Sequence, residues 1–123
     1  MSPMPTTGVI VVDHGSRLPD ANEFLVPVID ALRAGGHAIV EAAHLEIATP
    51  GIAAAFESCV TQGAEHIVVC PFFLLPGRHV TEDIPAQVAV CAADHDVTAV
   101  ITEPVGVHPE IAEVVAALVE TEL

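Results

Sequence analysis

Two short apolar runs, at positions 9–12 and 67–70, are the features of the sequence that most constrain its fold. Both runs consist mainly of Val and Ile, and neither contains a polar residue that would mark a solvent-facing side. Strands of this composition are typical of parallel sheets whose two faces are covered by helices. The sequence therefore predicts an α/β fold.

The rest of the chain alternates helix-forming stretches with further β-like runs, and Pro or Gly residues separate them. We expect strands at 9–12, 38–47, 67–70 and 97–101, and helices at 20–34, 49–61, 80–93 and 108–119. Pro27 predicts a kink or an early break in the first helix, whereas Thr49 and Pro50 have the residue types preferred where a helix begins. The order βαβαβαβα predicts a single domain over residues 1–123, with a four-stranded parallel sheet and helices on both faces.

Composition excludes several classes of partner. Seventeen acidic residues outweigh three Arg and no Lys, and the resulting formal net charge of −14 repels nucleic acid and anionic membranes. The chain has no Tyr or Trp, which disfavours a stacking platform for bases. Its N-terminus lacks the charge and apolar length of a signal peptide, and its three Cys form no CxxC pair. We expect a cytoplasmic protein with reduced thiols, in which Cys70 is buried in its strand.

Imidazole or carboxylate groups follow every predicted strand. In an open parallel sheet, ligands bind outside the carboxyl ends of the strands. The residues expected at this edge are His14 after the first strand, His44 and Glu46 after the second, His79 and Glu82 after the third, and Glu103 and His108 after the fourth. Imidazoles and carboxylates together suit iron, cobalt, nickel or zinc, and the lack of Cys disfavours a closed structural zinc site.

Plainer alternatives exist for each of these residues. His14 could cap the sheet through a hydrogen bond, and Glu46, which strand alternation would place on the same face as His44, could be a solvated edge residue. His79 could be an ordinary first-turn residue, although a cation there would oppose the helix macrodipole, which favours a neutral ligand. Arg17 and Arg78, two of the three cations, lie close in sequence to the two histidines. Because Arg pairs with carboxylates and phosphates, we expect a polyanionic substrate.

Four segments of the chain resemble the sirohydrochlorin chelatases of the CbiX type. They are VVDHGSR at 11–17, LEIATP at 45–50, PFFLLPGRHVTEDIP at 71–85 and GVHP at 106–109. The resemblance is collinear over essentially the whole chain, and the third segment is its most specific part. It implies a class II chelatase fold that inserts Co²⁺ or Fe²⁺ into sirohydrochlorin. Nickel insertion and non-catalytic metal delivery remain as alternatives.

The resemblance also implies roles for individual residues. The metal contacts fall on His14, Glu46 and His79, and the two imidazoles would also act in proton transfer. The residues expected to contact the tetrapyrrole are Ser16, Arg17, Phe72, Phe73, Leu74, Leu75 and Arg78. Glu82 is expected to be an accessory group that either supports a neighbouring site residue or relays a proton. The metal is a substrate, no organic cofactor is implied, and short chains of this type pair as homodimers. Asp13, where many relatives have Gly, would tune His14.

Overall fold

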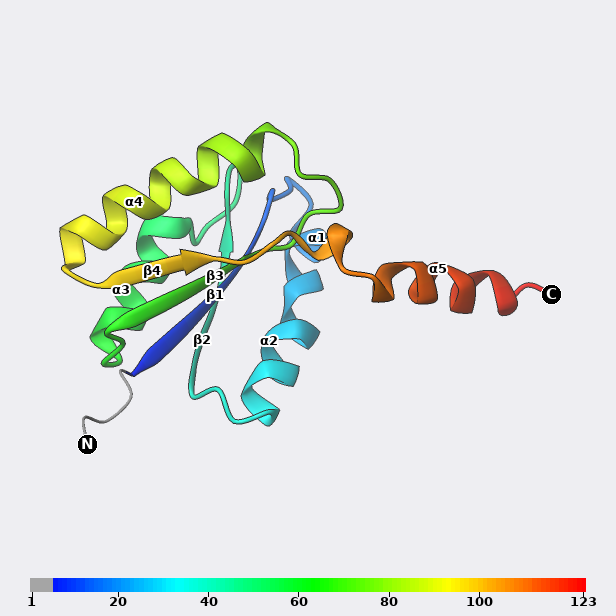
Figure 1. Ribbon diagram of the computed structural model, residues 1–123, viewed down its shortest axis with the longest axis horizontal. Coiled ribbons are helices and arrows are strands. Elements are labelled where there is room, and N and C mark those ends of the chain that lie inside the picture. The colour runs from blue at the N-terminus through cyan, green and yellow to red at the C-terminus, as the bar shows by residue number, and fades with distance from the viewer. Residues whose placement is uncertain (1–5) are drawn as a thin grey trace.

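The computed structural model describes residues 6–123 as a parallel α/β fold (Figure 1). The strands are β1 (Thr7–Asp13), β2 (Ile39–His44), β3 (His66–Pro71) and β4 (Thr98–Ile101). They form one sheet in the order β2-β1-β3-β4, and every neighbouring pair is parallel. The predicted four-stranded parallel sheet is confirmed.

The helices follow the predicted alternation. They are α1 (Pro19–Asn22), α2 (Val26–Ala34), α3 (Ile52–Thr61), α4 (Ile84–His95) and α5 (Glu110–Glu120), with short helical turns η1 (Glu23–Leu25), η2 (His79–Asp83) and η3 (Val105–Val107). The break expected at Pro27 is present, since α1, η1 and α2 replace one continuous helix. Within residues 6–123, no helix has the length and apolar character needed to cross a membrane.

The expected start of the helix at Thr49 and Pro50 is wrong. Helix α3 begins at Ile52, its N-cap residue is Gly51, and no side chain caps it. The carbonyl of Pro50 accepts a hydrogen bond from the backbone N–H of His44 at 2.8 Å, so this residue is tied to the end of β2. The Thr49–Pro50 peptide bond is cis and lies in the connecting loop.

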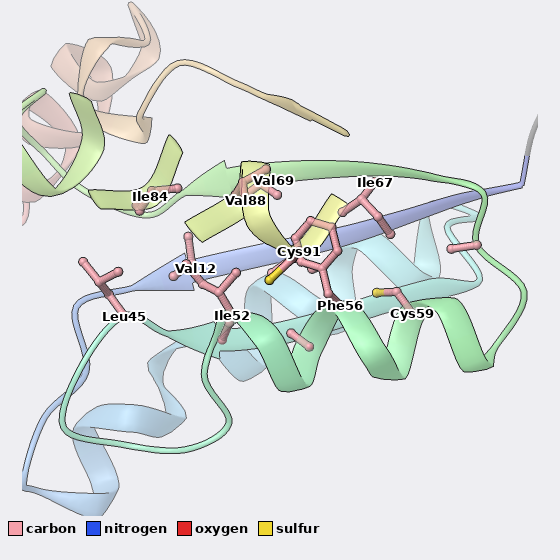
Figure 2. Close-up of a cluster of buried hydrophobic side chains, with 14 of the residues drawn as sticks. Val12, Leu45, Ile52, Phe56, Cys59, Ile67, Val69, Ile84, Val88 and Cys91 are labelled. Atoms are coloured by element: carbon pink, nitrogen blue, oxygen red, sulfur yellow. The ribbon is translucent and has the colours of Figure 1, made fainter. Parts of the chain in front are cut away.

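The main core lies between the sheet and the pair of helices α3 and α4 (Figure 2). Its labelled side chains are Val12, Leu45, Ile52, Phe56, Cys59, Ile67, Val69, Ile84, Val88 and Cys91. Phe56 is completely buried and fills the centre of this layer. Burial, with a smaller effect from Glu41, raises the pKa of the Cys59 thiol to about 11, which is the behaviour of an inert, reduced thiol.

A smaller core occupies the opposite face of the sheet, under α2. Leu25 and Ile29 pack there against Val9, Val11 and Val40. This cover reaches β1 and β2 but not β3. Cys70 of β3 is therefore only half-buried, and the prediction that it is a buried thiol is wrong; the buried thiols are Cys59 and Cys91.

Helix α5 extends away from the sheet and packs on neither face (Figure 1). The apolar stripe expected on this helix is present, but Val114, Val115 and Leu118 are 52%, 55% and 63% exposed. None of the helix residues is buried. The sequence predicted the helix correctly, whereas Val114, Val115 and Leu118 of its apolar face stay more than half exposed within residues 6–123.

Candidate active site at the carboxyl ends of the strands

His14 and Glu46 are brought together by the backbone at the ends of β1 and β2. Asp13 and His44 are register partners in the last rung of the two strands. Beyond them, Leu45 N–H donates to the Asp13 carbonyl at 2.8 Å and Glu46 N–H donates to the His14 carbonyl at 2.9 Å. This continued ladder places His14 Nε2 3.3 Å from Glu46 Oε2.

Gly15 permits this close approach of the two segments. Its φ is +94°, a conformation that residues with a Cβ rarely adopt, and a Cβ built there would lie 2.0 Å from the carbonyl oxygen of Glu46. Ile47, which follows Glu46, has φ +71° without being a glycine. The residue that follows each of these two side chains, Gly15 after His14 and Ile47 after Glu46, therefore has a positive φ that few residue types adopt.

His79 approaches His14 from the other side, at the first residue of η2. The two ring centroids are 5.0 Å apart, and the ring of Phe73 is 6.3 Å from that of His79. Asp83 Oδ2 lies 2.8 Å from His79 Nδ1. A proton on Nδ1 would be donated to this carboxylate, which leaves Nε2 with the free lone pair that a metal ion needs.

Asp83 is a site residue that sequence reasoning missed. The signal that could have revealed it is its position four residues after His79, because residues at this spacing on a helical turn lie on the same side. Asn22 was also missed as a site residue: its side chain accepts from the backbone N–H of Ser16 and donates to the Ser16 carbonyl, both at 2.8 Å. Asn22 thereby fixes the loop that contains Ser16 and Arg17.

Asp13 pairs with His44 rather than with His14. Its Oδ1 lies 2.5 Å from His44 Nδ1, and the His44 side chain is buried. Strand β2 ends at His44, so strand alternation does not extend to Glu46, which is exposed. The expectation that His44 and Glu46 share a face is wrong, because the chain turns between them.

The residues expected to contact the substrate differ in their exposure. Leu74 and Leu75 are largely exposed, Phe72 is partly exposed and Phe73 packs against the core. Arg78 projects into solvent, and its Nε donates to Glu82 Oε2 at 2.8 Å. Of these residues, Phe73 lies near the site, with its ring centroid 6.3 Å from that of His79, and Arg78 directly precedes His79 in the chain.

The three candidate ligands are half-exposed and form two adjacent pairs centred on His14. The exposed fractions of the His14, Glu46 and His79 side chains are 44%, 54% and 39%. In residues 6–123, no three His, Cys, Asp or Glu side chains form a group that could hold a metal ion. An arrangement of this kind differs from the closed tetrahedral cage of a structural zinc site.

The fold and the side chains at this edge define an α/β protein of the class that binds ligands outside the carboxyl ends of parallel strands. The family model described as CbiX matches residues 8–122. The chain belongs to the CbiX family.

Comparison with individual proteins agrees with this assignment. The chain is 44% identical over 110 residues to a chloroplastic sirohydrochlorin ferrochelatase of Arabidopsis thaliana, covering 88% of this chain and 49% of that protein. It is 36% identical over 89 residues to a sirohydrochlorin cobaltochelatase of Methanocaldococcus jannaschii, covering 72% of this chain and 62% of the relative. The chain thus spans about half of the first relative's length and less than two thirds of the second's.

A solved structure shares the fold. The sirohydrochlorin chelatase SirB from Bacillus subtilis, in complex with cobalt, superposes with a TM-score of 0.85 at 30% identity. The match covers 94% of this chain and 50% of that one. The fold described above is therefore that of a known chelatase, over about half of that protein's length.

Proposed function

We propose that this chain inserts a divalent metal ion, Co²⁺ or Fe²⁺, into sirohydrochlorin. The observation that supports the proposal is that His14 lies 3.3 Å from Glu46 and has its ring centroid 5.0 Å from that of His79, in the connections that follow β1, β2 and β3. The three side chains would have to close around the ion when it binds. The names of the similar chelatases support the same substrate and the same two metals. The metal ion is a substrate in this reaction, and no organic cofactor takes part.

The proposed chemistry removes two pyrrole N–H protons for each divalent ion that enters the macrocycle. His14, Glu46 and His79 bind the incoming ion through two imidazole nitrogens and a carboxylate oxygen. As the ion moves to the pyrrole nitrogens, each imidazole that releases it is free to accept one of the two protons. Asp83, hydrogen-bonded to His79 Nδ1, would stabilise the imidazolium that forms. The two protons that the imidazoles accept replace the two positive charges that the site loses when the metal ion leaves.

The residues around these ligands suit a broad, anionic ring. Phe72, Phe73, Leu74 and Leu75 would contact the face of the macrocycle, and Arg17 and Arg78 would pair with its carboxylates. Ser16 would donate a further hydrogen bond. Glu82, which holds Arg78 in an ion pair at 2.8 Å, would help to position that guanidinium.

The proposal includes a two-fold homodimer in the cytoplasm. One domain over residues 1–123 offers a single wall to a plate-like substrate, and an identical subunit is the simplest source of a second wall. The carboxyl ends of the two sheets would face each other across the substrate. Two subunits of net charge −14 repel each other, but salt screens this repulsion over about 8 Å at physiological ionic strength.

A spectroscopic assay tests the proposal directly. Catalytic amounts of the protein are mixed with sirohydrochlorin and Co²⁺, Fe²⁺ or Ni²⁺ without oxygen, and the loss of free tetrapyrrole absorbance is followed. We expect many turnovers per subunit with cobalt or iron. A protein that binds metal yet leaves the uncatalysed rate unchanged would be a carrier, and fastest turnover with nickel would change the assigned metal.

Replacing Arg78 with Ala is expected to weaken sirohydrochlorin binding about three- to tenfold and to leave metal affinity unchanged. The effect is modest because Arg78 is 81% exposed, and exposed ion pairs contribute only about 0–1 kcal/mol until a ligand desolvates them. Fluorescence titration with the macrocycle, and a separate metal titration, measure the two affinities.

The matched control for this variant is Arg33→Ala, which removes a guanidinium from the last turn of α2 together with its hydrogen bond to the Val40 carbonyl. Equal losses in both variants would mean that net charge alone attracts the substrate. Unchanged binding in Arg78→Ala would remove this residue from the site.

A further inference from the structure

A buried polar pair ends the apolar layer under α2, next to the candidate metal ligands. Val9, Val11 and Val40 pack beneath α2, and strand alternation carries the same face of β1 and β2 on to Asp13 and His44. Within residues 6–123, His44 is the only residue with a polar or charged side chain that is buried. Its Nδ1 donates a hydrogen bond to Asp13 Oδ1 at 2.5 Å. Neither side chain takes part in the metal insertion proposed above.

Packing of the core does not require a polar pair at this position. Taking two polar or charged groups out of water is unfavourable, and their mutual attraction compensates this loss only when the geometry of the pair is very good. Two apolar side chains of similar size would continue the layer of valines, and such replacements are often as stable as the buried pair or more stable. Asp13 and His44 therefore point to a role other than filling the core.

His44 contacts both of the connections that carry His14 and Glu46. A Cβ built on Gly15 would lie 3.2 Å from the Cβ of His44, so the turn that follows His14 rests against this residue. On the other strand, the backbone N–H of His44 donates to the Pro50 carbonyl at 2.8 Å, which ties the connection after Glu46 back to the end of β2. A change at His44 therefore reaches the backbone on both sides of the site.

Asp13 joins the same two connections through its backbone. Its carbonyl accepts from Leu45 N–H at 2.8 Å, and Glu46 N–H donates to the His14 carbonyl at 2.9 Å. The side-chain bond between Asp13 and His44 lies in the last rung of the two strands, directly before these two backbone bonds. Of the three hydrogen bonds, the side-chain bond is the one that substitutions can remove while the backbone groups stay in place.

We propose that Asp13 and His44 are positioning residues, which set the separation of His14 and Glu46 and so raise the affinity of the site for the divalent metal ion. This inference rests on the metal-binding role proposed above for His14 and Glu46. The pair acts through the backbone of the two connections and touches neither the ion nor the macrocycle. Replacing residues that orient metal ligands from outside the coordination shell typically changes metal affinity or activity by about 10–100-fold. We expect the lower end of this range, because the pair is not hydrogen-bonded to a ligand side chain.

Titration of the metal-free chain with Co²⁺, followed by the visible absorbance of the bound ion, tests the inference. The variant Asp13→Val/His44→Leu replaces both partners by apolar side chains, so that neither is left buried without its partner. We expect its midpoint of urea denaturation to be unchanged or higher and its affinity for Co²⁺ to be about tenfold lower. Binding of sirohydrochlorin, measured by fluorescence, should change by less than about threefold, because most of the proposed contacts to the macrocycle follow β3.

Asp13→Asn is the matched control, and it separates position from charge. It keeps the shape of the side chain and an oxygen that accepts from His44 Nδ1, but it removes the negative charge. We expect its affinity for Co²⁺ to stay within about threefold of wild type. A loss as large as that of the double variant would mean that the charge of Asp13 strengthens metal binding, and this would overturn the inference. Wild-type affinity in the double variant would overturn it as well, as would a loss of affinity that comes with a loss of stability.

Failure of this inference and failure of the proposed function give different results. Metal binding is measured without sirohydrochlorin, so a chain that binds Co²⁺ but does not insert it would contradict the proposed function and leave the comparison of variants decisive. Wild-type metal affinity and normal insertion in the double variant would remove the role of the pair and leave the proposed function intact. A wild-type chain that binds no Co²⁺ in this titration would overturn the inference, because the pair would have no metal site to position.

Discussion

Replacing His14 with Ala is expected to lower the rate of metal insertion by about 10²–10⁴-fold, the range typical of losing a residue that transfers protons. The expected loss is large because His14 is central to both close pairs, with Glu46 Oε2 at 3.3 Å and the His79 ring at 5.0 Å. Removing its imidazole leaves Glu46 and His79 without the group between them. His79→Ala should have a comparable effect, since it removes the second nitrogen ligand.

The measurement is the initial rate of sirohydrochlorin consumption at saturating Co²⁺, with the folded state checked by circular dichroism. His66→Ala is the matched control, because His66 begins β3 at the opposite end of the sheet and its side chain is partly solvent-accessible. This control should retain the wild-type rate. A folded His14→Ala variant within threefold of wild type would show that the proposed ligand set is wrong.

Replacing Gly15 with Ala is expected to lower the free energy of unfolding by about 3 kcal/mol, combining a left-handed backbone cost of roughly 1–2 kcal/mol with a steric clash. The clash arises because the new Cβ would lie 2.0 Å from the Glu46 carbonyl oxygen, where neither segment has room to move. Insertion activity should fall as well, since the same contact sets the distance between His14 and Glu46. Urea denaturation monitored by circular dichroism gives the free-energy difference.

Gly36→Ala separates the two causes. Gly36 has φ +103° and a Cβ there would meet no atom within 4 Å, so this variant carries the backbone cost alone. We expect it to lose about 1 kcal/mol and to keep full activity. If both variants lose the same free energy, the close approach of Gly15 to Glu46 does not constrain the site.

The sequence predicted the sheet well because buried parallel strands leave a direct trace in composition. The apolar residues of β1 have core neighbours on both sheet faces, and Ile67 and Val69 of β3 have them on the face under α3 and α4. Polar residues are disfavoured at such positions. The same argument predicted that His14, Glu46 and His79 come to one edge, since each follows a strand. Their close approach, by contrast, depends on the left-handed backbone at Gly15 and on the turn after β2, which periodicity does not encode.

The residues that sequence reasoning missed owe their roles to local turns or to contacts across the fold. Asp83 contacts His79 because η2 forms a helical turn immediately before α4, and Asn22 contacts Ser16 because α1 returns its last residue to the loop that follows β1. The apolar stripe of α5 predicted a helix with a covered face. An apolar stripe indicates that the helix packs against another apolar surface, but it does not indicate whether that surface belongs to the same chain.

The backbone conformation of Ile47 lowers the stability of the fold at a position next to a candidate metal ligand. A β-branched residue at φ +71° costs on the order of 1–3 kcal/mol relative to a relaxed conformation, and this residue follows the carboxylate of Glu46. Selection for thermostability alone would therefore favour Gly or Asn at position 47, because both tolerate a left-handed backbone. Glycine would also give the preceding residue more conformational freedom, and the carboxylate would lose its fixed position opposite His14.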